Sequence, residues 1–261
     1  MIAASKMRRA QEMALTGRPY SEHMLSLLAN LVAQPQDEDN VNRLLRRRDV
    51  QNLAIVHITP DRGLTGGLNL NINREGAQFI HEQSAHVSVV AVGKKGRDFM
   101  IRAGQEVKAV FTDLGDRPVI TDLTPIARLV ADDYAAERTD AVYLVYGRFV
   151  STTVQRATVS PLLPVVPAKL APRESVGYIF EPHSDYVLSE LLPRFVEMQV
   201  YHAVLESIAS EQSARMVAMR NATDNANDMV VDLTLVLNKT RQESITRELL
   251  DIVGGAAAVA R

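Results

Sequence analysis

The stretch "LAIVHITPDRGLTGGLN", residues 53–69, joins an apolar run to a helix-like segment through a glycine-rich turn. The run at 53–58 has no polar break apart from one histidine, and it reads as a buried strand. Gly63, Gly66 and Gly67 fall within five residues, which predicts a tight turn whose glycines adopt positive φ. A turn of this kind between a strand and a helix often cradles a phosphate, so a nucleotide site is the first hypothesis to weigh.

The turn departs from the known phosphate-binding patterns. It contains neither G-x-G-x-x-G nor G-K-[ST], and no lysine follows within reach of a β-phosphate. We therefore expect the turn to be structural, and the chain to bind no nucleotide or other cofactor. The six histidines are scattered without metal-ligand spacing, and no G-x-S-x-G sequence is present, so the sequence predicts no metal or catalytic site.

Composition narrows the class of protein. The chain has 261 residues, 46% of them hydrophobic, a formal net charge of −2 and no cysteine. Disulfides and thiolate catalysis are excluded. The balanced charge argues against a general nucleic-acid binder, which needs a basic excess. Since no run of about 18 apolar residues occurs, we expect no transmembrane segment.

The middle of the chain, residues 50–183, alternates apolar runs with helix-like stretches. Strand–helix alternation predicts an α/β domain with an open, largely parallel sheet and helices on its faces. The last run is polar on alternate residues at its start, which is typical of an edge strand. The expected strands lie at residues 53–58, 87–93, 106–114, 141–149 and 153–165.

The two ends of the chain have a different pattern. Residues 184–253 contain one proline, Pro193, and no glycine, which predicts a helix over 184–261. Apolar residues recur at alternate steps of three and four from Tyr201 to Val236, a spacing that favours a left-handed coiled coil. The helix-like segment 1–33 is the expected partner. The predicted fold class is thus α/β: a long antiparallel two-helix coiled coil formed by the N- and C-terminal helices, plus a Rossmann-like α/β domain with an open sheet.

Seven consecutive polar residues, "NKTRQES" at 238–244, interrupt the apolar stripe. One interpretation is a solvated stretch of helix, and the other is a polar contact surface for another chain. The apolar segment that follows is rich in Gly, Ala and Val, and it would be an aggregation risk on an uncovered helix. We therefore expect other subunits to surround this end of the chain.

Four motifs, in this order, resemble those of one family, the γ subunit of the F-type rotary ATP synthase of bacterial type. They are "AASKMRRAQ" at 3–11, "DRGLTGGLN" at 61–69, "EQSARMVAMRNATDNANDM" at 211–229 and "NKTRQESITRELLDIVGGAAA" at 238–258. The resemblance covers nearly the whole chain. The family has further helical turns before the segment that matches Met1, so we expect the N-terminal helix to be truncated here.

The resemblance implies that the chain is the central rotor shaft, which transmits torque between a proton-driven membrane ring and the catalytic sites on an alpha/beta hexamer. It also implies a non-catalytic subunit without a cofactor, since ATP is made and hydrolysed on the beta subunits. The implied partners are the alpha and beta subunits, the epsilon subunit and the c ring, with no nucleic acid. The implied location is the cytoplasmic face of the bacterial plasma membrane, as a peripheral subunit.

The resemblance further implies which residues make contacts. Those expected to couple to the beta subunit are Arg241, Gln242, Thr246, Glu248, Lys6, Arg8 and Arg9. Those expected to reach the c ring or the epsilon subunit are Phe180, Glu181, Pro182, Asp61 and Arg62. Arg241 offers a carboxylate a planar fork that lysine lacks. The basic residues near the N-terminus would complement acidic loops of the beta subunit.

A second hypothesis comes from another class: an α/β small-molecule-binding domain with a coiled-coil dimerisation arm. It would need a phosphate or cofactor motif, and the sequence contains none. A stoichiometric nucleotide on the isolated chain would favour it, whereas co-purification with alpha and beta subunits would favour the rotor.

Overall fold

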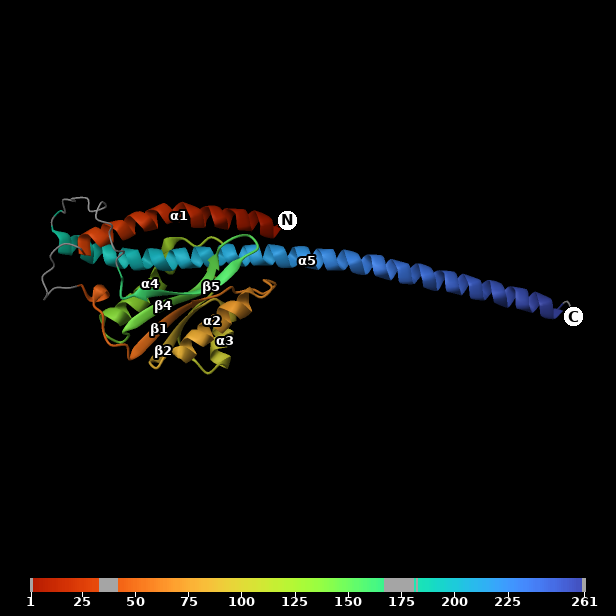
Figure 1. Cartoon of the computed structure of the whole chain (residues 1–261), viewed down its shortest axis with the longest axis horizontal. Helices are drawn as coiled ribbons and strands as arrows, with labels where there is room; N and C mark the ends of the chain where they lie inside the picture. The colour runs from red at the N-terminus through yellow and green to blue at the C-terminus, as the bar shows by residue number, and fades with distance from the viewer. Residues whose placement is uncertain (1, 33–41, 167–180, 182, 260–261) are drawn as a thin grey trace. The chain divides into compact units, whose positions relative to one another are not determined.

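The computed structural model describes residues 2–32, 42–166, 181 and 183–259. The chain divides into two compact units, Met1–Val217 and Ala218–Arg261. The first unit contains the sheet and most of the helices (Figure 1). The second unit consists of the later part of a single helix.

A five-stranded sheet forms the centre of the first unit, with the strand order β3-β2-β1-β4-β5. Four strands run parallel, and β5 pairs antiparallel with β4 at one edge. The strands are β1 (Asn52–Ile58), β2 (His86–Val92), β3 (Glu106–Phe111), β4 (Ala141–Phe149) and β5 (Gln155–Leu163). The open, largely parallel sheet expected from the apolar runs is therefore confirmed.

Side chains of β1 alternate between two hydrophobic clusters, because successive residues of a strand point to opposite faces of the sheet. Leu53 and Ile55 pack with α2 (Leu68–Glu82) on one face. Ala54 and Val56 belong to the larger cluster on the other face, which includes α4 (Ile120–Ala135). A short helix, α3 (Lys94–Arg102), and a 3-10 turn, η2 (Arg43–Leu45), complete the α/β domain.

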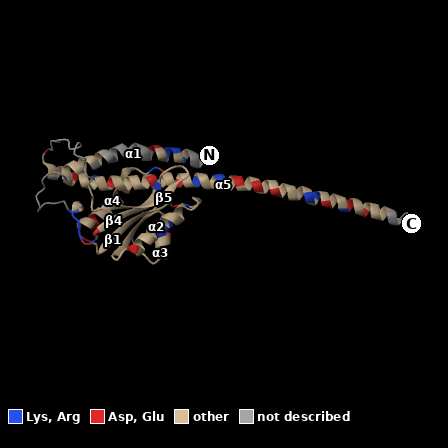
Figure 2. Ribbon diagram, viewed as in Figure 1, with Lys and Arg blue, Asp and Glu red and all other residues tan. Residues whose placement is uncertain are grey.

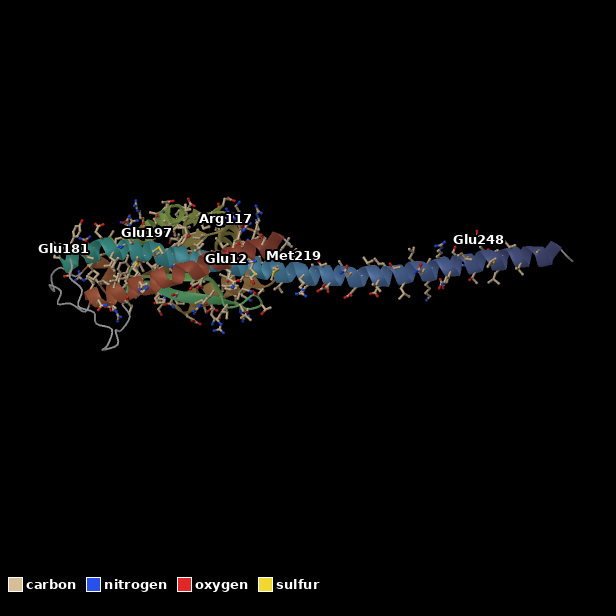
Figure 3. The ribbon with its side chains drawn as sticks, turned by 90° about the horizontal axis from the view of Figure 1, so that it is seen from above. Glu12, Arg117, Glu181, Glu197, Met219 and Glu248 are labelled. Atoms are coloured by element: carbon tan, nitrogen blue, oxygen red, sulfur yellow. The ribbon has the colours of Figure 1, made fainter. Side chains whose placement is uncertain are left out.

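The N-terminal helix α1 (Ile2–Val32) lies antiparallel beside the first part of α5 (Ser184–Val259), in both views of the ribbon (Figures 1 and 3). Leu28 and Leu31 of α1 share a buried cluster with Leu188 and Leu192 of α5. The predicted antiparallel pairing of the terminal helices is therefore confirmed. The apolar seam of α5 also joins the helix to the sheet, because the same cluster contains Val56 and Leu144 of β1 and β4.

The second unit has no buried side chain among its described residues. The apolar stripe is buried at Leu205, Ile208 and Gln212, but Met219 is 38% exposed and Met229 66% exposed. Large apolar side chains follow in the same exposed state, including Leu233, Val236, Leu249, Leu250, Ile252 and Val253. A helix this apolar and this exposed lacks the tertiary packing from which most helical stability in proteins comes.

Candidate functional site

The glycine-rich turn lies at the carboxyl edge of the parallel strands, directly after β1. The expectation that all three glycines have positive φ is wrong. Gly66 has φ +56°, but the other positive-φ residue of the turn is Leu64, at φ +64°, and Gly67 caps α2 with φ −83°. A non-glycine residue at positive φ is uncommon, so the backbone of this turn is set by its surroundings as well as by its glycines.

The carboxylate of Asp61 holds three loops of this edge together. Its Oδ1 accepts a hydrogen bond from the backbone N–H of Lys94 at 2.9 Å, at the start of α3. Its Oδ2 accepts one from the backbone N–H of Asp113 at 3.0 Å, in the loop after β3. Lys94 also pairs with the Asp113 carboxylate at 2.7 Å. The sequence suggested Asp61 as a contact with a partner. In the structure its carboxylate forms hydrogen bonds within the domain.

Helix α5 crosses the same edge and adds a polar cluster to it. Arg215 donates to Glu211 at 2.6 Å and to the carbonyl oxygen of Gly63, in the glycine turn, at 3.4 Å. Gln212 donates to Asp116, in the loop before α4, at 3.3 Å. Burial raises the pKa of the Glu211 carboxyl, while the guanidinium of Arg215 opposes that rise. The ion pair with Arg215 therefore favours the charged form of Glu211, which burial disfavours.

A cavity of about 50 Å³ remains between α5 and the strand ends. It is lined on the sheet side by Thr59, Asp61 and Gly93, and on the α5 side by Ser207 and Glu211. Doubly wound sheets bind their ligands at this carboxyl edge, in pockets of about 300 Å³ or more. Here α5 fills that place, and the remaining space suits a few water molecules. This geometry speaks against the small-molecule hypothesis.

Two serines of α5 fasten the helix to the β4–β5 hairpin. The hydroxyl of Ser210 donates to the carbonyl oxygen of Gly147 at 2.8 Å, and that of Ser213 donates to the carbonyl oxygen of Thr152 at 2.6 Å. Both serines are fully buried. A Cβ at Gly147 would lie 3.1 Å from Ile72 and 3.5 Å from Ser210, so the small residue permits the close approach of α5.

The basic residues of α1 differ in their surroundings. Lys6 pairs with Asp116 at 2.5 Å, which ties α1 to the loop before α4. Arg8 pairs with Glu12 one turn further along α1 at 3.3 Å. Arg9 is exposed and borders a hollow of about 350 Å³ together with Lys6, Ala10, Asp116 and Arg117. The first turns of α1 are accordingly rich in basic residues (Figure 2).

The residues suggested for contacts with partner subunits, whether the beta subunit or the c ring and epsilon subunit, divide between the two units. Arg241, Gln242, Thr246 and Glu248 lie in the second unit, where all four are exposed, and Glu248 is labelled in Figure 3. Lys239 and Glu243 form an i,i+4 ion pair at 3.9 Å within the polar stretch. In the first unit, Arg62 and Glu181 are exposed. Phe180 and Pro182 lie outside the described residues.

Sequence reasoning missed the polar cluster formed by Glu211, Gln212, Arg215 and Asp116. A signal existed, because Gln212 and Arg215 occupy positions of an otherwise apolar stripe. A polar residue at a seam position needs a partner when it is buried. The sequence could not identify those partners, because Asp116 lies 96 residues from Gln212 and Gly63 lies 152 residues from Arg215.

Together, these features define a class of protein: an α/β domain packs against the first part of a long helix, and the rest of that helix is exposed. A family profile described as ATP synthase matches residues 1–259. The ATP synthase gamma chain of Dehalococcoides mccartyi (strain CBDB1) is 58% identical over 260 residues, covering 100% of this chain and 91% of the relative. The ATP synthase gamma chain of Roseiflexus sp. (strain RS-1) is 49% identical over 263 residues, with the same coverage.

Solved structures agree. The chain is similar to one from the central stalk and c-ring structure of the Tetrahymena thermophila mitochondrial ATP synthase, with a TM-score of 0.64 and 26% identity. That match covers 85% of this chain and 96% of the other. The chain belongs to the ATP synthase gamma-chain family. No helix among the described residues is long and apolar enough to cross a membrane.

Proposed function

We propose that this chain is the central rotor shaft of an F-type ATP synthase. It transmits torque between a proton-driven membrane ring and the catalytic sites on a hexamer of alpha and beta subunits. The observation that carries the proposal is the exposure of α5 throughout residues 219–256, including more than ten large apolar side chains. An exposed apolar surface of this extent marks an interaction site, and the hexamer is the partner that covers it.

Within this proposal, α5 contacts the beta subunits through its polar interruption. Arg241, Gln242, Thr246 and Glu248 are all exposed, so they are free to form polar contacts with another chain. Near the N-terminus, the exposed side chains of Arg8 and Arg9 are available to acidic loops of the beta subunit. Lys6 contributes less, because Asp116 already neutralises its charge within the chain.

The α/β domain is the foot, which contacts the c ring and the epsilon subunit. Exposure of Arg62 and Glu181 supports their assignment to this surface. The family resemblance assigns Phe180 and Pro182 to the same surface. Asp61 contributes to this surface indirectly, by fixing the loops of the α/β domain, since its carboxylate accepts hydrogen bonds from two backbone N–H groups. The subunit is peripheral, at the cytoplasmic face of a bacterial plasma membrane.

We further propose that the chain supplies no catalytic residue and that the beta subunits make and hydrolyse ATP. Support comes from the carboxyl edge of the sheet, where a nucleotide would be expected but α5 is packed. Calorimetry with ATP and ADP on the isolated chain checks this part. One tight site per chain would contradict it.

A single-cysteine experiment tests the rotor assignment. The chain has no cysteine, so Leu250→Cys introduces a unique thiol at a side chain that is 67% exposed. We expect rapid maleimide labelling of the isolated chain and strong protection after assembly with alpha and beta subunits. Arg102→Cys, on the exposed side of α3, is the matched control and should label at the same rate in both states. Equal labelling of Leu250→Cys with and without the hexamer would refute the assignment.

A further inference from the structure

The glycine-rich turn has an unfavourable conformation at two of its residues. Leu64 has φ +64°, which is uncommon and strained for a residue other than glycine, and its side chain is 72% exposed, so little packing compensates the strain. Thr65 is 2% exposed, and its hydroxyl oxygen has no hydrogen-bond partner among the described residues. Burial of an unpaired polar group is also unfavourable. Contacts from outside the turn are therefore needed to hold it.

One of these contacts comes from α5. The Nη2 atom of Arg215 donates to the carbonyl oxygen of Gly63 at 3.4 Å and to Oε1 of Glu211 at 2.6 Å. The side chains of Arg215 and Glu211 are only 19% and 16% exposed. Within the described part of the chain, Glu211 provides the one carboxylate at ion-pair distance from Arg215. The position of the guanidinium against the turn therefore depends on the charge of Glu211.

The other charged groups near Glu211 disfavour its negative charge. Burial raises the pKa of Glu211, Arg215 opposes this rise, and the carboxylates of Asp116 and Asp61 add to it from the loops before α4 and after β1. The nearest cation of α1, Lys6, is paired with Asp116. The cavity of about 50 Å³ borders both Glu211 and Asp61, and it has room for water that can deliver a proton to Glu211.

We propose that Glu211 and Arg215 form a pH-dependent ion pair that holds the glycine-rich turn against α5. A proton taken from water by the carboxylate of Glu211 removes the anionic partner of Arg215. A buried guanidinium without its partner is unfavourable, so Arg215 turns towards solvent and the carbonyl group of Gly63 loses its donor. The turn then relaxes at Leu64 and Thr65. This inference is independent of the rotor assignment, because all of these groups belong to the first unit of this chain.

A buried thiol in the turn reports its opening in the full-length chain. Because the chain has no cysteine, Thr65→Cys introduces a unique thiol at a position that is 2% exposed. The measured quantity is the rate at which a disulfide reagent modifies this thiol, divided by the rate for the exposed thiol of Arg102→Cys at the same pH. The division removes the pH dependence of thiolate formation, so the ratio measures how often the turn opens.

We expect the ratio to rise about fivefold or more when the pH is lowered from about 8 to about 5, because protonated Glu211 becomes more populated. Glu211→Gln, added to Thr65→Cys, should give the high ratio already at the upper pH and flatten the pH profile, since the amide is uncharged like the protonated carboxyl group. Arg215→Gln should have the same effect, because it removes the donor to Gly63 directly.

Two controls separate a local opening from other effects. Glu190→Gln, at an exposed position of α5, should leave the ratio and its pH profile unchanged. Val90→Cys places a thiol at a 1% exposed position of β2 and reports unfolding of the whole domain; Glu211→Gln should not raise its labelling. The inference is overturned if the Thr65→Cys ratio does not depend on pH, or if Glu211→Gln leaves its pH profile unchanged. Equal increases at the Thr65→Cys and Val90→Cys thiols would also overturn it.

Discussion

At the scale of single residues, Asp61 and Arg62 are neighbours with opposite surroundings. The two carboxylate oxygens of Asp61 accept backbone N–H groups from two loops, at 2.9 and 3.0 Å. Arg62 is exposed. The two residues are adjacent in one sequence motif, so the sequence does not distinguish their roles. The structure shows that Asp61 forms hydrogen bonds within the domain, whereas Arg62 carries a surface charge. Substitutions at these two positions should therefore affect different properties of the protein.

Asp61→Asn should lower the free energy of unfolding by about 1.5–3 kcal/mol, because the amide replaces a charged acceptor and turns its NH2 towards a backbone N–H. Arg62→Gln should change it by less than about 0.5 kcal/mol, as is usual for exposed sites. Urea denaturation of the two variants, followed by circular dichroism, measures the difference. Equal loss in both variants would mean that the hydrogen bonds of Asp61 contribute little to stability.

His57 is a second residue whose role is internal. It is fully buried on β1, and its Nε2 lies 2.8 Å from Oδ1 of Asn73, so Nε2 carries the proton that is donated. Glycines pack against the ring, and a Cβ at Gly96 would approach its Cδ2 to 2.6 Å. Burial lowers the pKa of His57 from 6.5 to about 4, with the bond to Asn73 opposing the shift. The imidazole is therefore neutral at physiological pH.

This shift predicts a loss of stability in mild acid. The folded pKa lies below the unfolded one, so the unfolded chain binds more protons between about pH 6.5 and pH 4. The free energy of unfolding should fall as the pH drops through this window, by roughly 2 kcal/mol between pH 7 and pH 5. His57→Gln should flatten the slope measured by denaturation at several pH values. His81→Gln, at an exposed position, should leave the slope as it is in the wild type.

At the scale of elements, the strands and the long helix could be predicted from the sequence, but the way they meet could not. The run at 53–58 is apolar because β1 is central and buried on both faces. Helix α5 is long because no proline or glycine occurs between Pro193 and Gly254. By contrast, the spacing of Glu211 and Arg215 is compatible with an i,i+4 pair, but it does not indicate that the glycine turn lies against Arg215.

The polar interruption of α5 carries the next prediction. Arg241→Ala combined with Gln242→Ala should leave the melting temperature of the isolated chain nearly unchanged, because both side chains are exposed and pack against no core. In the reassembled complex with alpha and beta subunits, the same pair should weaken ATPase activity. Losing a charge-assisted contact at an interface costs about 2 kcal/mol or more.

Thr240→Ala, an exposed position in the same turn, serves as the matched control. Steady-state ATPase and ATP-driven proton pumping are the readouts. Normal turnover and pumping in the Arg241/Gln242 variant would show that the stretch is only a solvated helix face.

At the scale of the whole molecule, the two units differ in what stabilises them. Residues up to Val217 share two hydrophobic clusters built from every layer of the domain. Residues 219–256 have backbone hydrogen bonds but no buried side chain. Regions with few buried contacts open locally at low free-energy cost.

Hydrogen exchange should report this difference directly. In the isolated chain, amides of residues 219–256 should exchange much faster than those of β1 or β2, because a helix without tertiary packing is marginal in water. Assembly with alpha and beta subunits should slow the former group and leave the latter unchanged. If the isolated chain already protects 219–256 as strongly as β1, another contact covers the helix and the rotor proposal loses its main support.

The serine bonds between α5 and the hairpin have a mechanical consequence. Purely apolar contacts are non-directional, so a smooth helix in an apolar groove could slip about its own axis at modest cost. Ser210 and Ser213 bond to the carbonyl oxygens of Gly147 and Thr152, and hydrogen bonds weaken steeply when their angle changes. These two hydrogen bonds therefore oppose rotation of the helix about its own axis relative to the sheet, so that torque on the sheet is transmitted to the helix.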